Sequence, residues 1–249
     1  MNPNVAHEPI IKIENLYKKY GDNVVLDGFN LNLYQGENLV IMGKSGSGKS
    51  VMIKCLIGLE IPDSGTIEIM SQKLEHLSLK ALDEIRADIG FLFQGSALYD
   101  SMTVRENLEF PLRRHISKFG NVKDTLPLVE EALQNVGLKN VIDLMPNELS
   151  GGMKRRVALA RTLILKPKII IYDEPTTGLD PITSKEIILL MKSVQEKYKT
   201  SSIIITHDVD CARVIANRMI LLIDGKNYAE GTFAELSTSQ DPKVKAFFK

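Results

Sequence analysis

One segment constrains the fold of this chain more than any other, because residues 43–50 fit the pattern G-x-x-x-x-G-K-[ST] without a mismatch. The segment consists of Gly43, Lys44, Ser45, Gly46, Ser47, Gly48, Lys49 and Ser50. An apolar run precedes it at residues 38–42, and residues 51–56 can begin a helix. A glycine-rich turn with an incidental lysine would match by chance in roughly one chain of this length in a hundred. The segment therefore predicts a strand–loop–helix unit in an α/β fold.

The residue types in this loop suit the binding of phosphate. Glycines let the backbone turn tightly, so that successive N–H groups point at phosphate oxygens, and the following helix adds the positive end of its dipole. Lys49 supplies a compact positive charge for the β- and γ-phosphates, and the Ser50 hydroxyl is placed to ligate Mg²⁺. We therefore predict that residues 43–50 bind ATP together with Mg²⁺.

A second element with two acidic residues supports this prediction. The apolar run at residues 169–172 ends in Asp173 and Glu174. A solvated acidic strand end is common and would be the preferred interpretation if this motif stood alone. Paired with the phosphate loop upstream, Asp173 is predicted to hold Mg²⁺ directly or through water, and Glu174 to orient or deprotonate the attacking water.

Short β-branched runs recur along the chain with helical stretches between them. Strands are expected at residues 10–16, 38–42, 66–69, 89–93, 169–172, 202–206 and 219–223. Several runs are almost continuously apolar, as expected when both faces of a parallel sheet are covered. Helices are expected at residues 127–136 and along the apolar stripe from Ile187 to Val194, with Thr183 or Ser184 as its cap. The β-branched runs disappear between residues 94 and 166, which predicts a helical insertion.

Composition and charge exclude several classes of protein. The chain is 44% hydrophobic and 25% charged, which is ordinary for a globular protein with a sizeable core. Its 31 basic residues balance 31 acidic ones, which leaves no electrostatic footprint for a nucleic acid. No apolar run approaches the roughly 20 residues of a membrane span, and no secretory leader is recognisable. Cys55 and Cys211 fit no metal-binding spacing, so we expect them to pack in the core of a protein of the reducing cytosol.

A third motif connects the chain to a known family. The segment Leu149-Ser150-Gly151-Gly152-Met153 closely resembles the LSGGQ signature of ABC ATPases and precedes the acidic strand end, as in that family. Ser150 can cap a helix over residues 153–165, which leaves N–H groups at the positive end of that helix for a second anion. In the family this site completes the ATP pocket of the opposite subunit, so the resemblance implies a homodimer that sandwiches two nucleotides.

Four more residues match the family pattern in order. Tyr20 resembles the aromatic residue that stacks on adenine, and Gln94 resembles the glutamine that reaches Mg²⁺ and water near the membrane partner. Asp180 resembles the D-loop aspartate that communicates across the dimer, and His207 resembles the histidine that contacts the γ-phosphate. Each match alone is weak, because a tyrosine usually packs and a histidine is usually a satisfied polar residue.

The resemblance covers almost the whole chain and implies a specific architecture. It implies a P-loop NTPase core with a mostly parallel sheet, an N-terminal antiparallel β part, and a helical subdomain that carries the signature. We expect a single ABC ATP-binding domain over residues 1–249, with the helical subdomain at about residues 95–165. ATP and Mg²⁺ are the implied cofactors, and the activity is ATP hydrolysis coupled to transport.

Within the family, the chain is similar to the Mla-type lipid-transport branch. Met153 replaces the usual glutamine of the signature, and residues 93–104, 180–183 and 241–244 also resemble that branch. The resemblance implies phospholipid transport between the membranes of a Gram-negative envelope, on the cytoplasmic face of the inner membrane. The implied partners are a transmembrane permease, a STAS-type regulator and an MCE-type lipid-binding subunit. The Met153 side chain carries no amide, so it cannot form the hydrogen bonds of the glutamine that it replaces.

Two alternatives remain open at the level of sequence. A soluble ABC ATPase acting on DNA ends or ribosomes usually carries long coiled-coil insertions or two fused cassettes, and neither is recognisable here. An ABC importer for a small solute, such as an amino acid, would have the same cassette, because the cassette does not touch the cargo.

Overall fold

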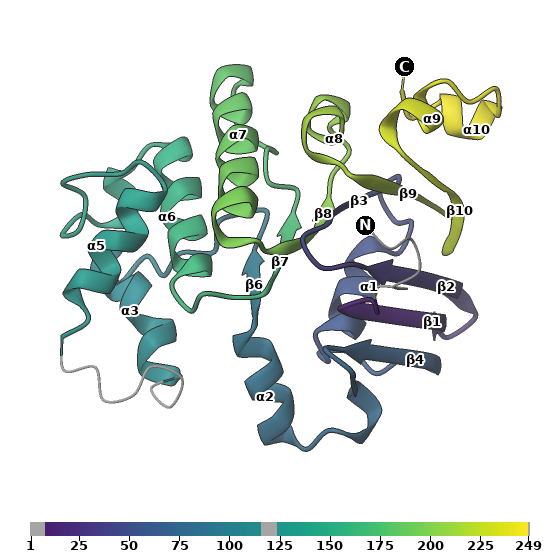
Figure 1. The fold of residues 1–249 in the computed structure, drawn as a ribbon, viewed down its shortest axis with the longest axis horizontal. Coiled ribbons are helices and arrows are strands. Elements are labelled where there is room, and N and C mark those ends of the chain that lie inside the picture. The colour runs from purple at the N-terminus through teal and green to yellow at the C-terminus, as the bar shows by residue number, and fades with distance from the viewer. Residues whose placement is uncertain (1–7, 116–123, 249) are drawn as a thin grey trace, which may run out of the picture. The chain divides into compact units, whose positions relative to one another are not determined.

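The computed structural model describes residues 8–115 and 124–248, which fall into two compact units (Figure 1). The first unit comprises Met1–Arg86 and Ser201–Lys249, and the second comprises Ala87–Thr200. The phosphate loop therefore belongs to the first unit, whereas the acidic strand end and the signature segment belong to the second.

An antiparallel sheet forms the N-terminal part of the first unit. Its strands, in the spatial order β2-β1-β4-β5, are β2 (Asn23–Leu33), β1 (Ile11–Tyr20), β4 (Ser64–Ile69) and β5 (Gln72–Lys73). Ile11 and Ile13 of β1 are buried and alternate with more exposed residues, as expected for a strand with one face toward a core. This sheet confirms the expected antiparallel β part.

The phosphate loop of the first unit follows a central buried strand. Strand β3 (Asn38–Met42) lies between β8 (Ser201–Ile205) and β9 (Arg218–Ile223) and runs parallel to both, and β10 (Lys226–Gly231) pairs antiparallel with β9. All residues of β3 and β8 are buried, including the polar Asn38, Ser201 and Ser202 at their starts, and an uninterrupted apolar run follows in each strand. The helices of this part of the chain are α1 (Lys49–Leu56), η1 (Leu74–His76), α2 (Leu79–Ala87), α8 (Val209–Ile215), α9 (Phe233–Ser237) and α10 (Pro242–Lys245).

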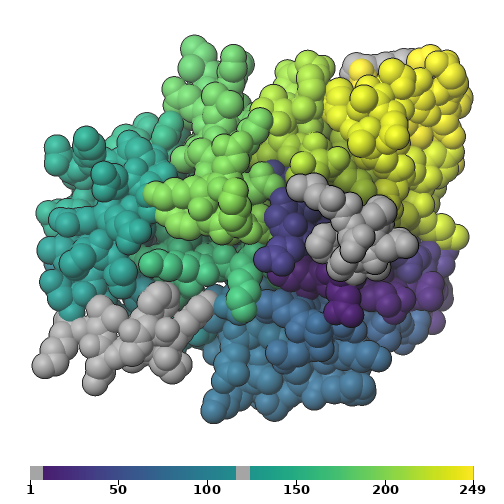
Figure 2. Space-filling view, in the orientation of Figure 1, coloured from purple at the N-terminus to yellow at the C-terminus, as the bar shows by residue number. Residues whose placement is uncertain are grey.

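The second unit combines two parallel strands with most of the long helices. Strands β6 (Ile89–Leu92) and β7 (Ile169–Asp173) pair in parallel, with Leu92 opposite Tyr172. The helices are α3 (Val104–Arg114), α5 (Leu126–Asn135), η2 (Pro146–Glu148), α6 (Gly151–Leu163) and α7 (Pro181–Tyr198). Helices α3, α5 and α6 contact one another, and the space-filling view shows them as closely packed atoms (teal to green in Figure 2).

Most predicted elements are present, but one predicted cap is wrong. Every predicted strand is found within a few residues of its expected bounds, and the helices predicted at residues 127–136 and 153–165 correspond to α5 and α6. Helix α7 begins earlier than predicted, because Asp180 rather than Thr183 or Ser184 is its N-cap. The Asp180 carboxylate accepts hydrogen bonds from the N–H groups of Ile182 and Thr183, both at 3.0 Å.

A buried carboxylate connects two helices of the second unit. Glu109 of α3 is 6% exposed, and its carboxylate accepts hydrogen bonds from Arg105 at 2.8 Å, Arg113 at 2.7 Å and Thr125 at 2.7 Å. Burial alone would raise the pKa of Glu109, but the hydrogen bonds from Arg105, Thr125 and Arg113 outweigh it and lower the pKa to about 2. Because Thr125 immediately precedes α5, the carboxylate joins α3 to the start of α5.

We expect Glu109→Gln to lower the free energy of unfolding by about 2 kcal/mol at pH 7, allowing for the partial exposure of both arginines. A lowered folded-state pKa contributes stability above the unfolded-state pKa, and this contribution is lost as the pH falls from about 5 toward 2. Urea unfolding should therefore show that the difference in free energy of unfolding between the parent and the variant becomes smaller as the pH falls. Glu130→Gln, at an exposed position of α5, is the matched control. If the difference in free energy of unfolding between Glu109→Gln and the parent did not change with pH, the role assigned to Glu109 would be contradicted.

Two further expectations can be compared with the structure. Cys55 and Cys211 are both buried in the first unit, which confirms their packing in the core. Burial raises the pKa of the Cys55 thiol to about 11. Within residues 8–115 and 124–248, no helix combines the length and hydrophobicity needed to cross a bilayer.

Candidate nucleotide-binding site

The phosphate loop connects β3 to α1, as its sequence predicts. The ammonium group of Lys49 donates to the carbonyl oxygens of Gly43 at 2.6 Å and Lys44 at 2.9 Å, so the side chain lies along its own loop. Gly48 is the N-cap of α1 with a φ of 104°, and a Cβ there would lie 2.7 Å from the Val25 carbonyl oxygen. Only glycine fits both requirements, so the close approach of β2 fixes the position of the loop.

The first unit places His207 beside this loop. Parallel strands β3 and β8 align Ile41 with Ile205, and the N–H of Thr206 donates to the Ile41 carbonyl at 3.3 Å. The loop begins two residues after Ile41 and His207 lies two residues after Ile205, so both follow the carboxyl ends of adjacent strands. Ligands of open parallel sheets bind at this edge. The side chain of His207 is exposed, and Asp208 caps the helix α8 that follows.

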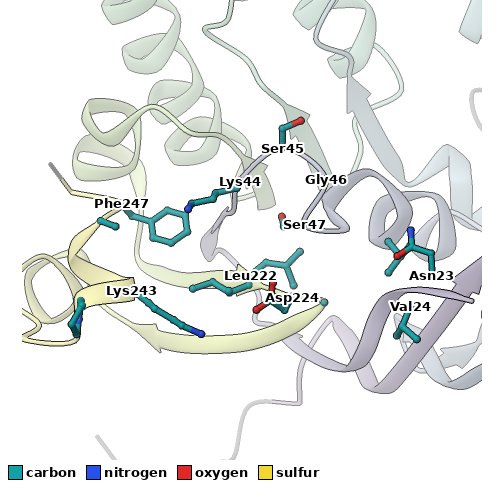
Figure 3. Close-up of a pocket in the computed structure, with 15 residues that line it drawn as sticks. Asn23, Val24, Lys44, Ser45, Gly46, Ser47, Leu222, Asp224, Lys243 and Phe247 are labelled. Atoms are coloured by element: carbon teal, nitrogen blue, oxygen red, sulfur yellow. The ribbon is translucent and has the colours of Figure 1, made fainter.

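A cavity of about 740 Å³ opens beside the first half of the loop (Figure 3). Lys44, Ser45, Gly46 and Ser47 line it on the loop side. The opposite walls, which the sequence did not predict, come from three other segments, residues 23–25, 222–225 and 242–247, and include Asn23, Val24, Val25, Leu222, Asp224, Lys243 and Phe247. In Figure 3, Lys44 points toward Phe247. A cavity of this volume falls within the range that holds small molecules.

Tyr20, the predicted adenine-stacking residue, ends strand β1 of the first unit. Its side chain is 46% exposed, and the Lys18 ammonium lies 5.3 Å from the centre of its ring. Lys18 is itself held by the Ile61 carbonyl at 2.8 Å and the Glu60 carboxylate at 3.3 Å. Burial of the hydroxyl, followed by the charge of Glu60, raises the pKa of Tyr20. Tyr20 is not part of the cavity wall, so its stacking role remains a prediction.

The second unit brings Gln94 to the same sheet edge as the two predicted acids. Strands β6 and β7 are parallel with Leu92 opposite Tyr172, so Gln94 and Glu174 each lie two residues beyond the paired position. Asp173 is the last residue of β7. Glu174 has a φ of 48°, which is uncommon for a residue with a side chain, and its carboxylate accepts a hydrogen bond from the Thr177 hydroxyl at 3.2 Å. Backbone strain of this kind clusters at functional sites.

The signature segment caps a helix of the second unit as predicted. Ser150 is the N-cap of α6, and its hydroxyl accepts a hydrogen bond from the Met153 N–H at 3.2 Å. Ser150 and Gly151 are exposed, so the positive end of a 13-residue helix faces outward. At Gly152, a Cβ would come within 2.7 Å of the Thr183 methyl group, so glycine allows α6 to approach α7 closely.

Asp180, the predicted D-loop residue, has an evident structural role as the cap of α7. The Thr183 hydroxyl donates to its carboxylate at 2.5 Å. This hydrogen bond, together with the backbone N–H groups of Thr183 and Ile182, lowers the pKa of Asp180. Its predicted communication across a dimer is a separate role that remains a prediction.

The predicted metal ligands suit Mg²⁺ rather than a metal held entirely by protein. Within the described parts of the chain, no group of three or more His, Cys, Asp or Glu side chains could hold a metal ion. The predicted donors are the Ser50 hydroxyl, the Gln94 amide oxygen and the Asp173 carboxylate. Mg²⁺ prefers such oxygen ligands, binds few protein groups and takes the remainder from substrate phosphates and water. The donor set therefore fits the ion.

Comparisons with known proteins identify the family of this chain. The family described as "ABC transporter" matches residues 26–177. The chain is 40% identical to the "Intermembrane phospholipid transport system ATP-binding protein MlaF" of Haemophilus influenzae, over 98% of this chain and 91% of that protein. It is 36% identical to the "Methionine import ATP-binding protein MetN" of Campylobacter jejuni, over 96% of this chain and 75% of that protein.

A solved structure is similar in fold as well as in sequence. The dimeric post-hydrolysis state of the ATP-binding cassette MJ0796, bound to ADP and Pi, has a TM-score of 0.80 and 36% identity. The similarity covers 90% of this chain and 98% of that cassette. The fold is therefore that of an ATP-binding cassette.

Proposed function

This chain belongs to the ABC transporter family and is the ATPase subunit of a transporter, and we propose that the cargo of that transporter is phospholipid. The observation that carries the proposal is the 40% identity to the phospholipid-transport protein over 98% of this chain. We propose the same partners as for that branch: a second copy of the chain, a transmembrane permease, a STAS-type regulator and an MCE-type subunit. The chain would then lie on the cytoplasmic face of an inner membrane.

In the proposed mechanism, the motifs of the first unit bind the phosphates and those of the second unit activate water. In the first unit, the loop N–H groups and Lys49 bind the β- and γ-phosphates of ATP. In the second unit, Glu174 accepts a proton from water while the water oxygen attacks the γ-phosphorus. The bond from that phosphorus to the bridging oxygen breaks, and ADP leaves with the electron pair. Mg²⁺, held by Ser50, Gln94 and Asp173, would neutralise the charge that develops on the phosphate oxygens.

The proposed site is completed by a second chain. Ser150, Gly151 and Gly152 carry N–H groups at the N-terminal end of α6, a place that favours an anion. We propose that they bind the γ-phosphate of ATP held by the loop of the other chain, while His207 contacts the γ-phosphate held by its own loop. Residues 95–165 would act as the helical subdomain that carries this contact. The cassette MJ0796, with 36% identity, is a dimer in its ADP-bound structure.

A methionine importer is the second candidate, because the chain is also 36% identical to a methionine-import protein. The cassette does not contact the cargo, so the two candidates share every residue of the proposed hydrolytic site. The phospholipid proposal is favoured by the higher identity, by Met153 in the signature and by the Mla-like segments at residues 93–104, 180–183 and 241–244.

Reconstitution of the chain with its membrane partner should distinguish the candidates. The complex, purified through this chain and placed in proteoliposomes, is expected to move a fluorescent phospholipid to an acceptor in an ATP-dependent manner. A matched complex that carries Glu174→Gln should transfer no more lipid with ATP than the parent complex transfers without ATP. Radiolabelled methionine is tested in the same vesicles. ATP-driven methionine accumulation without lipid transfer would refute the phospholipid proposal in favour of the importer.

A further inference from the structure

Arg155 of α6 is a cation buried among backbone carbonyls. The residue is 3% exposed, and its guanidinium donates to the Phe93 carbonyl at 2.8 Å and the Thr177 carbonyl at 3.2 Å. Its Nε is buried without a hydrogen-bond partner among the described residues. Neither of these two carbonyl groups carries a negative charge, and burial lowers the pKa of Arg155.

Stability alone does not explain an arginine at this position. A buried charge costs free energy that carbonyl dipoles only partly return, and an apolar side chain of similar volume often serves as well or better. The neighbouring Val157 and Ala158 show that α6 buries apolar side chains here. The guanidinium does, however, offer two parallel donors in a rigid plane, which fixes the separation and orientation of the groups it contacts.

The groups that Arg155 contacts belong to the segments proposed to handle ATP. Phe93 immediately precedes Gln94. The hydroxyl of Thr177 donates to the Glu174 carboxylate, while its carbonyl accepts from Arg155. Arg155 itself lies five residues after Ser150, the cap of the same helix. One side chain thus connects residues 93–97 (the Gln94 segment), residues 174–177 (the Glu174 turn) and helix α6 (the signature helix).

A second arginine of α6 holds the other end of the Gln94 segment. Arg161 donates to the carbonyls of Ala97 at 2.9 Å and Ser96 at 3.1 Å. Ser96 and Ala97 have φ values of 63° and 47°, so two successive residues with side chains adopt the left-handed conformation. Helix α6 therefore contacts the chain on both sides of Gln94, and the position of this segment follows the position of the helix.

We propose that Arg155 is a positioning residue for ATP hydrolysis, which sets Gln94 and the Glu174 turn relative to the signature helix, given the roles proposed above for these segments. When the Ser150 end of α6 binds the nucleotide of a second chain, the guanidinium transmits the position of the helix to Gln94. The two ATP sites of a dimer are then coupled through Arg155 within each chain.

The test uses ATP hydrolysis by the full chain, which does not depend on the cargo. Arg155→Met is expected to lower kcat by about 10–100-fold, because small displacements of positioning groups have effects of this size. The KM for ATP should change by less than about threefold, since the phosphate loop lies in the other unit. Cooperativity in ATP concentration should fall toward a Hill coefficient of 1. Arg155→Lys keeps the charge but loses the planar fork, and should show an intermediate kcat even where the methionine variant fails to fold.

Arg156 provides a matched control on the same helix. It donates to the Val136 carbonyl at 2.8 Å and pairs with Glu186 at 2.9 Å, away from the Gln94 segment. Arg156→Met should lower the melting temperature but leave kcat within about twofold of the parent. Equal losses of kcat in the Arg155 and Arg156 variants would overturn the proposal, because they would show a general effect on α6.

A double-mutant cycle with Gln94→Ala separates the inference from the site assignment. If Arg155 acts partly through Gln94, adding Arg155→Met to Gln94→Ala should lower kcat by a smaller factor than Arg155→Met does alone, because only the effect on the Glu174 turn then remains. If the double variant instead showed the full product of the two single-variant losses in kcat, the proposed coupling between Arg155 and Gln94 would be overturned. Parental activity of Arg155→Met beside an impaired Gln94→Ala would refute the inference alone, whereas parental activity of Gln94→Ala would refute the proposed role of Gln94 itself.

Discussion

Replacing Glu174 with glutamine is expected to slow ATP hydrolysis by about 10²–10⁴-fold, the usual contribution of a general base. Glutamine keeps the shape of the side chain and can still accept the hydrogen bond from the Thr177 hydroxyl, but it cannot take a proton from water. The Lys49 ammonium and the loop N–H groups are unchanged, so ATP should remain bound. The decrease should therefore appear in kcat, measured as phosphate release at saturating ATP.

The same variant should become a dimer when ATP and Mg²⁺ are present. Bound ATP is proposed to bridge the loop of one chain and the Ser150 end of α6 in the other, and without hydrolysis the bridge persists. Size-exclusion chromatography with and without ATP measures this change. Hydrolysis within a few-fold of the parent would contradict the assignment and would make His207 the next candidate.

Asp173→Asn is the matched control for Glu174→Gln. Both changes replace a carboxylate with an amide at neighbouring positions, the last residue of β7 and the residue that follows it. Asp173 is proposed to hold Mg²⁺, so its variant should lose Mg²⁺-dependent ATP binding and should not form the dimer. The pair of variants thereby separates chemistry from binding.

Lys49→Ala is expected to abolish productive ATP binding, because it removes the charge that faces the β- and γ-phosphates. Fluorescent-nucleotide titration should show no saturation at ATP concentrations that saturate the parent, and phosphate release should fall to the background level. Lys54→Ala, at an exposed position of the same helix, should bind and hydrolyse ATP like the parent. Parental binding by the Lys49 variant would show that the loop assignment is wrong.

The elements that the sequence predicts well are those whose pattern is local. Strands β3, β7 and β8 each contain a short uninterrupted apolar run, as expected for strands of a parallel sheet that is covered on both faces. Ser150 was predicted as a cap because serine stands directly before a helical run, and it is one. Asp180 was missed as the cap of α7 because Thr183 and Ser184 have equal propensity and lie nearer to the apolar stripe.

Strands β2 and β10 are absent from the sequence prediction, although the turn before β10 can be read from the sequence. Asp224-Gly225 separates β9 from β10, and both residues have positive φ values, 49° and 75°. An Asp-Gly pair between two strands is a strong hairpin signal. Strand β10 is half-exposed and polar, so its composition does not resemble that of a strand. Strand β2 contains Gly28 at a φ of 69°, which interrupts its alternating pattern.

The walls of the cavity beside the phosphate loop could not be predicted in the same way. They bring together Val25, Asp224 and Phe247, which lie in distant parts of the chain and belong to no motif. The contacts of Arg155 were also unpredictable, because every residue has a backbone carbonyl and the sequence does not indicate which of them a side chain will contact. Motifs predict which residues touch the nucleotide, whereas tertiary packing decides which residues hold them in place.

The burial of both native thiols makes the unmodified chain suitable for site-directed labelling. Maleimides react with thiolates at exposed positions, whereas Cys55 and Cys211 are buried and the pKa of Cys55 is raised to about 11. A single cysteine placed at an exposed position, such as Phe93 beside the Gln94 segment, should therefore take up a spectroscopic probe selectively. Distances between two such probes in an ATP-bound dimer would then follow the movement of the Gln94 segment without prior replacement of the native cysteines.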